Sequence, residues 1–170
     1  MKSNIAACHL KLEQWKEAIK SATESLDGLD RVEKADAAEE KDEEEEKAKQ
    51  KQEEDDHEVE EEIVSSGAQK SAPAVQEQSA AEEARRKRRD DVRRIRAKAL
   101  MRRARARSEL GGWSNLSGAE DDYKLLSAMT NLSPADRKIV QSQLRNLPPK
   151  VKEAQEKEMG EMWGKLKDVS

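Results

Sequence analysis

Residues 98–126 contain two amphipathic stripes separated by a pair of glycines, and this feature constrains the fold more than any other in the chain. Both stripes follow the three- and four-residue spacing of one helix face. The stripe residues are Leu100, Ala104 and Arg107 before the glycines, and Ala119, Tyr123 and Leu126 after them. Gly111 and Gly112 reach left-handed backbone angles at little steric cost, so they end the first helix. The pattern predicts a helical hairpin with close approach at Ala104 and Ala119.

A similar pattern lies near the amino terminus, in residues 4–26. Ala6 and Ala18 are twelve residues apart, whereas the corresponding alanines of the later pattern are fifteen apart, so the later copy has three additional residues in its turn. Self-similarity of this kind is typical of repeat proteins, in which each hairpin packs against its neighbours. Because Asn4 already lies within the pattern, we expect the chain to begin inside a longer array.

The composition leaves material for only a small core, since 41% of the residues are charged, 34% are hydrophobic and Phe is absent. Cys8 is the single cysteine, which excludes an internal disulfide and suits a reducing compartment. No apolar run reaches the roughly eighteen residues of a membrane span, and the first residues lack the apolar stretch of a secretory signal. These features predict a cytoplasmic protein without a membrane span.

The segment 32–84 is dominated by acidic and small polar residues. Residues 33–62 contain seventeen Asp or Glu against five Lys. Like charges repel, and few apolar residues are present to offset the entropy of ordering, so disorder is expected. Residues 64–81 are small and polar, with Pro73 among them, which is typical of a linker. We therefore interpret 32–84 as an acidic disordered insert followed by a linker.

Residues 82–107 reverse the sign of the charge, with thirteen Lys or Arg. The densest run is 85–89, and it leads directly into the second predicted hairpin, so 85–130 is interpreted as a basic helix followed by that hairpin. The basic run is a solvated helix extension, a nuclear localisation signal or a nucleic-acid contact. No aromatic residues interleave the cations, so base stacking has no platform and nucleic-acid binding is the least favoured of the three.

Two helices are expected in residues 131–170. Ser133 is a good N-cap, and Pro134 suits the first helical position. The helix that follows carries an amphipathic face able to cover one side of the hairpin. Pro148 and Pro149 are expected to interrupt it, because proline lacks the amide donor and clashes with the preceding turn. The predicted helices therefore span 134–147 and 150–168, after a partial hairpin in residues 1–31.

Signals for catalysis are weak in this sequence. Cys8 and His9 are adjacent, so on a helix they point in different directions and make a poor metal pair. There is no glycine-rich phosphate loop and no Gly-x-Ser-x-Gly motif. We therefore expect neither an enzyme nor a bound metal or cofactor.

The candidate binding residues are Asn4, Lys98 and Arg102, which lie on the first helices of the two predicted hairpins. Lys98 and Arg102 are four residues apart and share one helix face. Asn supplies amide donors, and Lys and Arg supply positive charge. This chemistry suits the C-terminal carboxylate of a peptide and a neighbouring acidic side chain. Ordinary polar helix surface is the alternative interpretation.

At these residues the chain resembles the carboxylate-clamp tetratricopeptide proteins. The matching stretches are Asn4 in Asn-Ile-Ala-Ala-Cys and the run Lys98-x-x-x-Arg102-Arg103-Ala104. The tail stretches Leu147-Pro148-Pro149-Lys150 and Met162-Trp163-Gly164-Lys165-Leu166-Lys167-Asp168 are similar to the tetratricopeptide repeat protein one group and its fungal members. The resemblance covers roughly 4–30 and 95–168, and in the related proteins the sequence continues beyond both ends.

The resemblance implies an all-α fold of tetratricopeptide-like hairpins, a partial α-solenoid with C-terminal capping helices. It also implies a co-chaperone that binds the Glu-Glu-Val-Asp tails of the seventy- and ninety-kilodalton heat-shock chaperones. Asn4, Lys98 and Arg102 match three of the five clamp positions, so weak binding is expected. The alternative is a structural interaction scaffold whose charged segments recruit basic or nucleic-acid partners.

Overall fold

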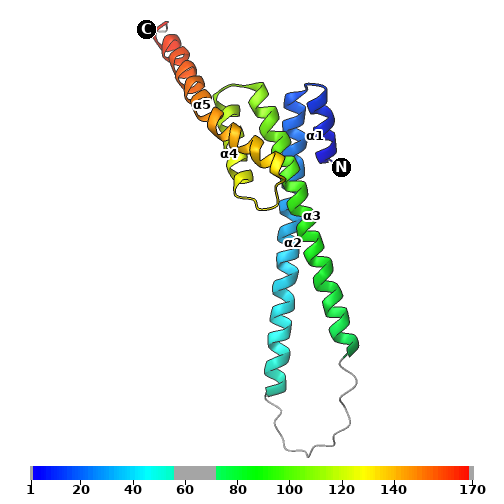
Figure 1. Cartoon of the computed structure of the whole chain (residues 1–170). Coiled ribbons are helices and arrows are strands. Elements are labelled where there is room, and N and C mark those ends of the chain that lie inside the picture. The colour runs from blue at the N-terminus through cyan, green and yellow to red at the C-terminus, as the bar shows by residue number, and fades with distance from the viewer. Residues whose placement is uncertain (1, 56–71, 169–170) are drawn as a thin grey trace, which may run out of the picture. The chain divides into compact units, whose positions relative to one another are not determined.

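The computed structural model describes the backbone of residues 2–55 and 72–168, and the side chains of residues 2–51 and 79–168. All regular secondary structure in the described residues is helical, which confirms the expected all-α class. The helices are α1 (Lys2–Lys11), α2 (Trp15–Asp55), α3 (Ala72–Leu110), α4 (Trp113–Ser127) and α5 (Pro134–Asp168), shown in Figure 1. Within the described ranges, none of them combines the length and the apolar character that crossing a membrane requires.

The chain divides into two compact units, and α2 and α3 contribute to both. The first unit comprises Met1–Gly28 and Val92–Ser170, and the second comprises Leu29–Asp91. The amino-terminal hairpin α1–α2, the glycine-separated pair α3–α4 and all of α5 therefore contribute to the first unit. The acidic run and the first part of the basic run, up to Asp91, belong to the second.

The small residues of the two predicted hairpins are fully buried in the first unit. Ala6 on α1 and Ala18 on α2 have no exposed surface, and neither have Ala104 on α3 and Ala119 on α4. Small side chains at such positions let neighbouring helix axes approach closely. Burial at all four positions is what the predicted hairpins require. The tetratricopeptide-like repeat itself stays a prediction.

The helix break at the two glycines is confirmed. Gly111 and Gly112 have φ angles of 73° and 86°, in the region that glycine adopts at little cost. The amide of Gly111 donates to the carbonyl of Arg107 at 3.1 Å, which closes the last turn of α3. The amide of Leu116 donates to the carbonyl of Gly112 at 2.9 Å and opens α4.

The core of the first unit lies where α3, α4 and α5 meet. Its largest fully buried apolar side chains are Leu126 on α4 and Val140 and Leu147 on α5. Tyr123 lies in the same cluster and is also buried. The amphipathic face of α5 therefore packs against the hairpin, as the sequence predicts.

The start of α5 follows the prediction, but its predicted interruption is wrong. The hydroxyl of Ser133 accepts the amide of Asp136 at 3.2 Å, so Ser133 caps the helix. The helix then continues through Pro148 and Pro149 to Asp168. Each proline removes one backbone hydrogen bond, but core contacts on both sides, at Leu147 before the prolines and at residues 151 and 154 after them, hold the helix together.

The acidic insert is helical as far as the structure describes it, which corrects the expectation of disorder for 32–55 and 72–84. The reason is pairing between the two runs of opposite charge. Arg85 contacts Glu43, Arg89 contacts Glu40, and Arg88 contacts Asp36 at 3.2 Å. This attraction offsets the repulsion that either run would suffer alone, and both runs are rich in good helix formers.

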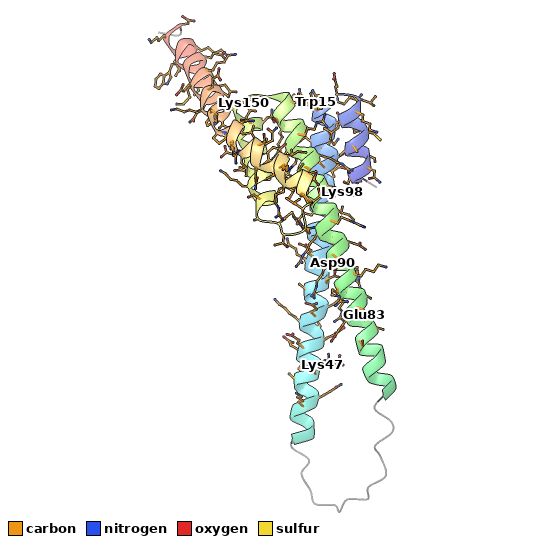
Figure 2. All side chains as sticks on the ribbon, in the orientation of Figure 1. Trp15, Lys47, Glu83, Asp90, Lys98 and Lys150 are labelled. Carbon is orange, nitrogen blue, oxygen red and sulfur yellow. The ribbon has the colours of Figure 1, made fainter. Side chains whose placement is uncertain are left out.

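The boundaries of α3 also differ from the expected ones. Helix α3 begins at Ala72 rather than near residue 85, and Pro73 lies in its first turn, where proline is tolerated. Lys47 on α2 and Glu83 and Asp90 on α3 mark the second unit in Figure 2. The predicted insert and linker also include residues 56–71, which lie outside the described part of the chain.

Candidate functional site

A cleft of about 530 Å³ lies among α1, α3, α4 and α5 of the first unit. It is lined by Ala7, Leu10 and Lys11 of α1, by Met101, Arg102, Arg105, Ser108 and Glu109 of α3, by Tyr123 of α4, and by Ile139 and Gln143 of α5. Three of its side chains are cations and one is an acid, so the cleft is net positive. We call it the cationic cleft.

The positive charge of the cleft follows from the spacing of charged residues along α3. Arg102, Arg105 and Glu109 are three and four residues apart, so they lie along one face of the helix. Ala104, which directly precedes Arg105, is buried on another face. The helix thus directs its alanine contact into the core while its charged face lines the cleft.

Arg102 is held in place by the start of α1. One nitrogen of its guanidinium donates to both the carbonyl and the hydroxyl oxygen of Ser3, each at 2.5 Å. Ser3 is buried, and Arg102 is half-buried. Burial lowers the pKa of Arg102 from its ordinary value, yet an arginine keeps its proton at neutral pH. The site therefore contains a fixed and partly desolvated positive charge.

Lys98 lies in an adjoining cavity of about 320 Å³. That cavity shares Met101 and Arg102 with the cationic cleft, and its far side includes Ser133 and Asp136. Lys98 is exposed, and Figure 2 labels it on α3. The structure therefore places Lys98 and Arg102 on one connected surface, as their spacing predicts.

Asn4, the third predicted site residue, lies outside both cavities. It is exposed on α1 and lines neither the cationic cleft nor the adjoining cavity. Its sequence neighbour Ser3 is the residue that Arg102 binds. Asn4 is thus one residue away from the arginine contact, at the edge of the predicted site.

Sequence reasoning did not identify Lys11 and Arg105 as members of the site. Arg105 follows Arg102 by three residues, so the same-face argument that linked Lys98 with Arg102 would have included it. Lys11 gives no such signal, because its place depends on how α1 packs beside α3. Ile139 and Gln143 of α5 complete the lining.

Arg103, which lies within the run that carries the resemblance, points elsewhere. It binds both carboxylate oxygens of Asp122 on α4, at 2.9 and 2.6 Å. Arg107 also contacts Asp122 and donates to the carbonyl of Gly118 at 3.3 Å. A Cβ atom at Gly118 would lie 2.9 Å from the Arg107 guanidinium, so glycine leaves the space that this contact needs. These arginines connect α3 to α4 and serve the fold.

No family model, curated protein or solved structure matches this chain. Among the described residues, no group of three or more His, Cys, Asp or Glu is placed to hold a metal ion.

The lining of the cleft combines cations with apolar side chains. Leu10, Met101 and Ile139 supply apolar surface beside the guanidinium groups of Arg102 and Arg105. Such a surface can hold a carboxylate by charge-assisted hydrogen bonds while an apolar side chain next to that carboxylate is removed from water. An extended peptide with an acidic end has both features.

Proposed function

We propose that the first unit is an adaptor that binds the acidic C-terminal tails of partner proteins. The observation that carries this proposal is the cationic cleft, where Arg102 and Arg105 lie beside apolar side chains and Lys98 is next to them on the same helix. The resemblance to carboxylate-clamp proteins names heat-shock chaperones as the class of partner. A clamp of this kind binds the C-terminal tail of the chaperone and catalyses no reaction.

Arg102 is the central residue of the proposed clamp. Its Ser3 contacts fix its guanidinium before any ligand arrives, which lowers the entropy lost on binding. Its fork of donors has further N–H groups available for a carboxylate. Because the site is partly desolvated, a charge-assisted bond there is stronger than on open surface.

Lys98 and Arg105 extend the positive charge in both directions along α3 from Arg102. Both are exposed, so each contributes less than Arg102 and acts mainly on acidic side chains that precede the terminal carboxylate. Asn4 follows Ser3, the residue that Arg102 contacts, and its side chain can add amide donors to a bound tail.

A scaffold that recruits nucleic acid through its basic run is less well supported. Arg85, Arg88 and Arg89 are each bonded to an acidic residue of α2. Phosphates would have to displace these carboxylates before they could bind. The contacts within the second unit thus oppose the alternative function.

The proposal is tested by calorimetric titration with a peptide ending in Glu-Glu-Val-Asp. We expect Lys98→Ala and Arg105→Ala each to weaken binding about twofold to fivefold, since exposed charge pairs contribute up to about 1 kcal/mol. Lys138→Ala is the matched control, because Lys138 is an exposed cation on α5 that does not line the cleft. Unchanged binding in both Lys98→Ala and Arg105→Ala would exclude the clamp.

A further inference from the structure

The carboxy-terminal part of α5 carries an exposed apolar stripe. Its members are Met159 (40% exposed), Met162 (56%), Trp163 (61%) and Leu166 (57%). Their spacing of three, one and three residues places them on one helix face. All side chains from Glu156 to Asp168 are exposed, and Figure 1 shows this part of α5 extending past α4. A continuous apolar face of this kind normally has a partner.

The stripe is distinct from the face with which α5 packs against the core. Leu147 and Ala154 belong to the packing face. At about 100° per residue, that face continues through Glu158, Glu161 and Lys165. Consistent with this, Glu158 accepts the amide of Trp113 at the start of α4, at 2.8 Å. The packing face also includes Val140, Leu144 and Val151. The stripe is centred roughly a quarter of a turn from that face, so it is a second apolar face.

We propose that this stripe pairs with the same stripe of a second copy of the chain, with the two helices antiparallel. The charges beside the stripe support this occupant. The charged residues nearest the stripe are Glu158 and Lys165 on the side of the packing face, and Glu156 and Lys167 on the opposite side. Each edge of the stripe therefore carries an acid followed by a base. A two-fold antiparallel pair sets each edge beside the same edge of its partner, running in the opposite direction.

In that arrangement opposite charges meet on both edges. Glu156 faces the partner's Lys167, and Glu158, through its second carboxylate oxygen, faces the partner's Lys165. A parallel pair would instead bring opposite edges together at one level, so that acids meet acids and bases meet bases. In the antiparallel pair, the rest of the first unit of one copy lies at one end of the contact and that of the other copy at the opposite end. The two units therefore do not clash.

The net charge of the segment also favours a second copy. Residues 150–168 contain five Lys and five Asp or Glu, so two copies do not repel each other as wholes. The same balance gives little attraction to an anionic lipid surface, which recruits helices with excess Lys or Arg. The contact is small compared with the roughly 20–30 residues a side of a standard interface, so the pair is weak and reversible.

The first test is sedimentation equilibrium of the full chain over about 10 µM to 1 mM, the range of a weak complex. We expect a concentration-dependent shift from monomer to dimer, which Leu166→Glu abolishes. Leu125→Glu on α4 is the matched control, because Leu125 is 56% exposed against 57% for Leu166. Circular dichroism checks that both variants keep their helix content. A monomer throughout, or equal behaviour of the two variants, would overturn the proposal.

Charge reversal tests the orientation. Lys167→Glu should weaken the dimer at least about threefold, and adding Glu156→Lys to it should restore the association. A stronger dimer in Lys167→Glu would indicate parallel pairing and contradict the proposal. Cosedimentation of a monomeric chain with vesicles of anionic phospholipid, lost in Leu166→Glu, would show that the stripe faces lipid and would also contradict it.

Discussion

Arg103 and Asp122 form a two-pronged ion pair inside the first unit, with N–O distances of 2.9 and 2.6 Å. The side chain of Asp122 is 2% exposed, and Arg107 contacts it as well at 3.1 Å. A carboxylate withdrawn from water is tolerated only while cations and hydrogen bonds compensate it. Asp122 therefore fixes α4 against α3, and with it the helix face that lines the cationic cleft.

Removal of that carboxylate should destabilise the first unit strongly. Asp122→Ala leaves two partly buried guanidinium groups without their partner, so we expect the free energy of unfolding to fall by about 3–5 kcal/mol. Asp121→Ala is the control, since Asp121 is exposed and should change stability by no more than about 0.5 kcal/mol. Urea unfolding measures both. Equal effects at the two positions would show that the buried pair has no special importance.

Alanine substitution should change the stability of the fold in opposite directions at Gly111 and at Gly160. Gly111 has a φ of 73°, so Gly111→Ala forces a side chain into left-handed backbone and should cost about 1–2 kcal/mol. Gly160 lies inside α5 with nothing within 4 Å of a Cβ atom, so Gly160→Ala should stabilise the chain by about 0.5–1 kcal/mol. Thermal unfolding distinguishes the signs, and a stabilising Gly111→Ala would be inconsistent with the described turn.

Tyr123 is the single tyrosine of the chain and gives a direct probe of the core. Burial, which is the main cause, raises the pKa of Tyr123 to about 12. The neutral phenol is therefore favoured in the folded state, and this contribution to stability is present below about pH 10 and lost as the pH rises through about 12. Tyrosinate absorbance should rise near pH 12 in buffer and near pH 10 in urea. A native midpoint at the ordinary value would place Tyr123 in solvent.

The ion pairs between α2 and α3 in the second unit should be lost with acid and with salt. The hydrogen bond from Arg85, the largest cause, lowers the pKa of Glu43 below its ordinary 4.5. Its stabilising contribution is thus present above that value and is lost as the pH falls through the lowered pKa. Salt at about 1 M should screen the same exposed pairs.

Hydrogen exchange of the α2 amides near Glu43 measures this loss. Protection should drop in Glu43→Gln at neutral pH and low salt, and it should fall in the unaltered chain on acidification or at high salt. The control is Glu45→Gln, an exposed acid two residues away. Protection that is insensitive to salt, and equal in the two variants, would mean that charge pairing does not stabilise these helices of the second unit.

Local patterns were sufficient to predict part of this fold. The spacing around Gly111 and Gly112 predicted where α3 ends and α4 begins, because a left-handed glycine is a property of a few residues. Ser133 was recognisable as a cap for the same reason. The long helices of the second unit were not predictable in this way, since Glu43 and Arg85 are 42 residues apart and neither run signals its partner.

The candidate site was predicted in part for the same physical reason. Lys98 and Arg102 share a face of one helix, and their common surface follows from helical periodicity alone. Lys11 reaches the cleft only through the packing of α1, and the burial of Arg102 depends on its contact with Ser3, 99 residues away. The continuation of α5 through Pro148 and Pro149 likewise depends on tertiary contacts, which outweigh local propensity.

The central claim, that the cationic cleft binds a terminal carboxylate, is tested most directly by one calorimetric comparison. The full chain is titrated at low ionic strength with a peptide ending in Glu-Glu-Val-Asp, once as the free acid and once as the C-terminal amide. Loss of charge-assisted hydrogen bonds worth about 1.5–3 kcal/mol predicts that the amide binds about tenfold to a hundredfold more weakly. Equal affinity for the two peptides, or binding of neither, would contradict the account.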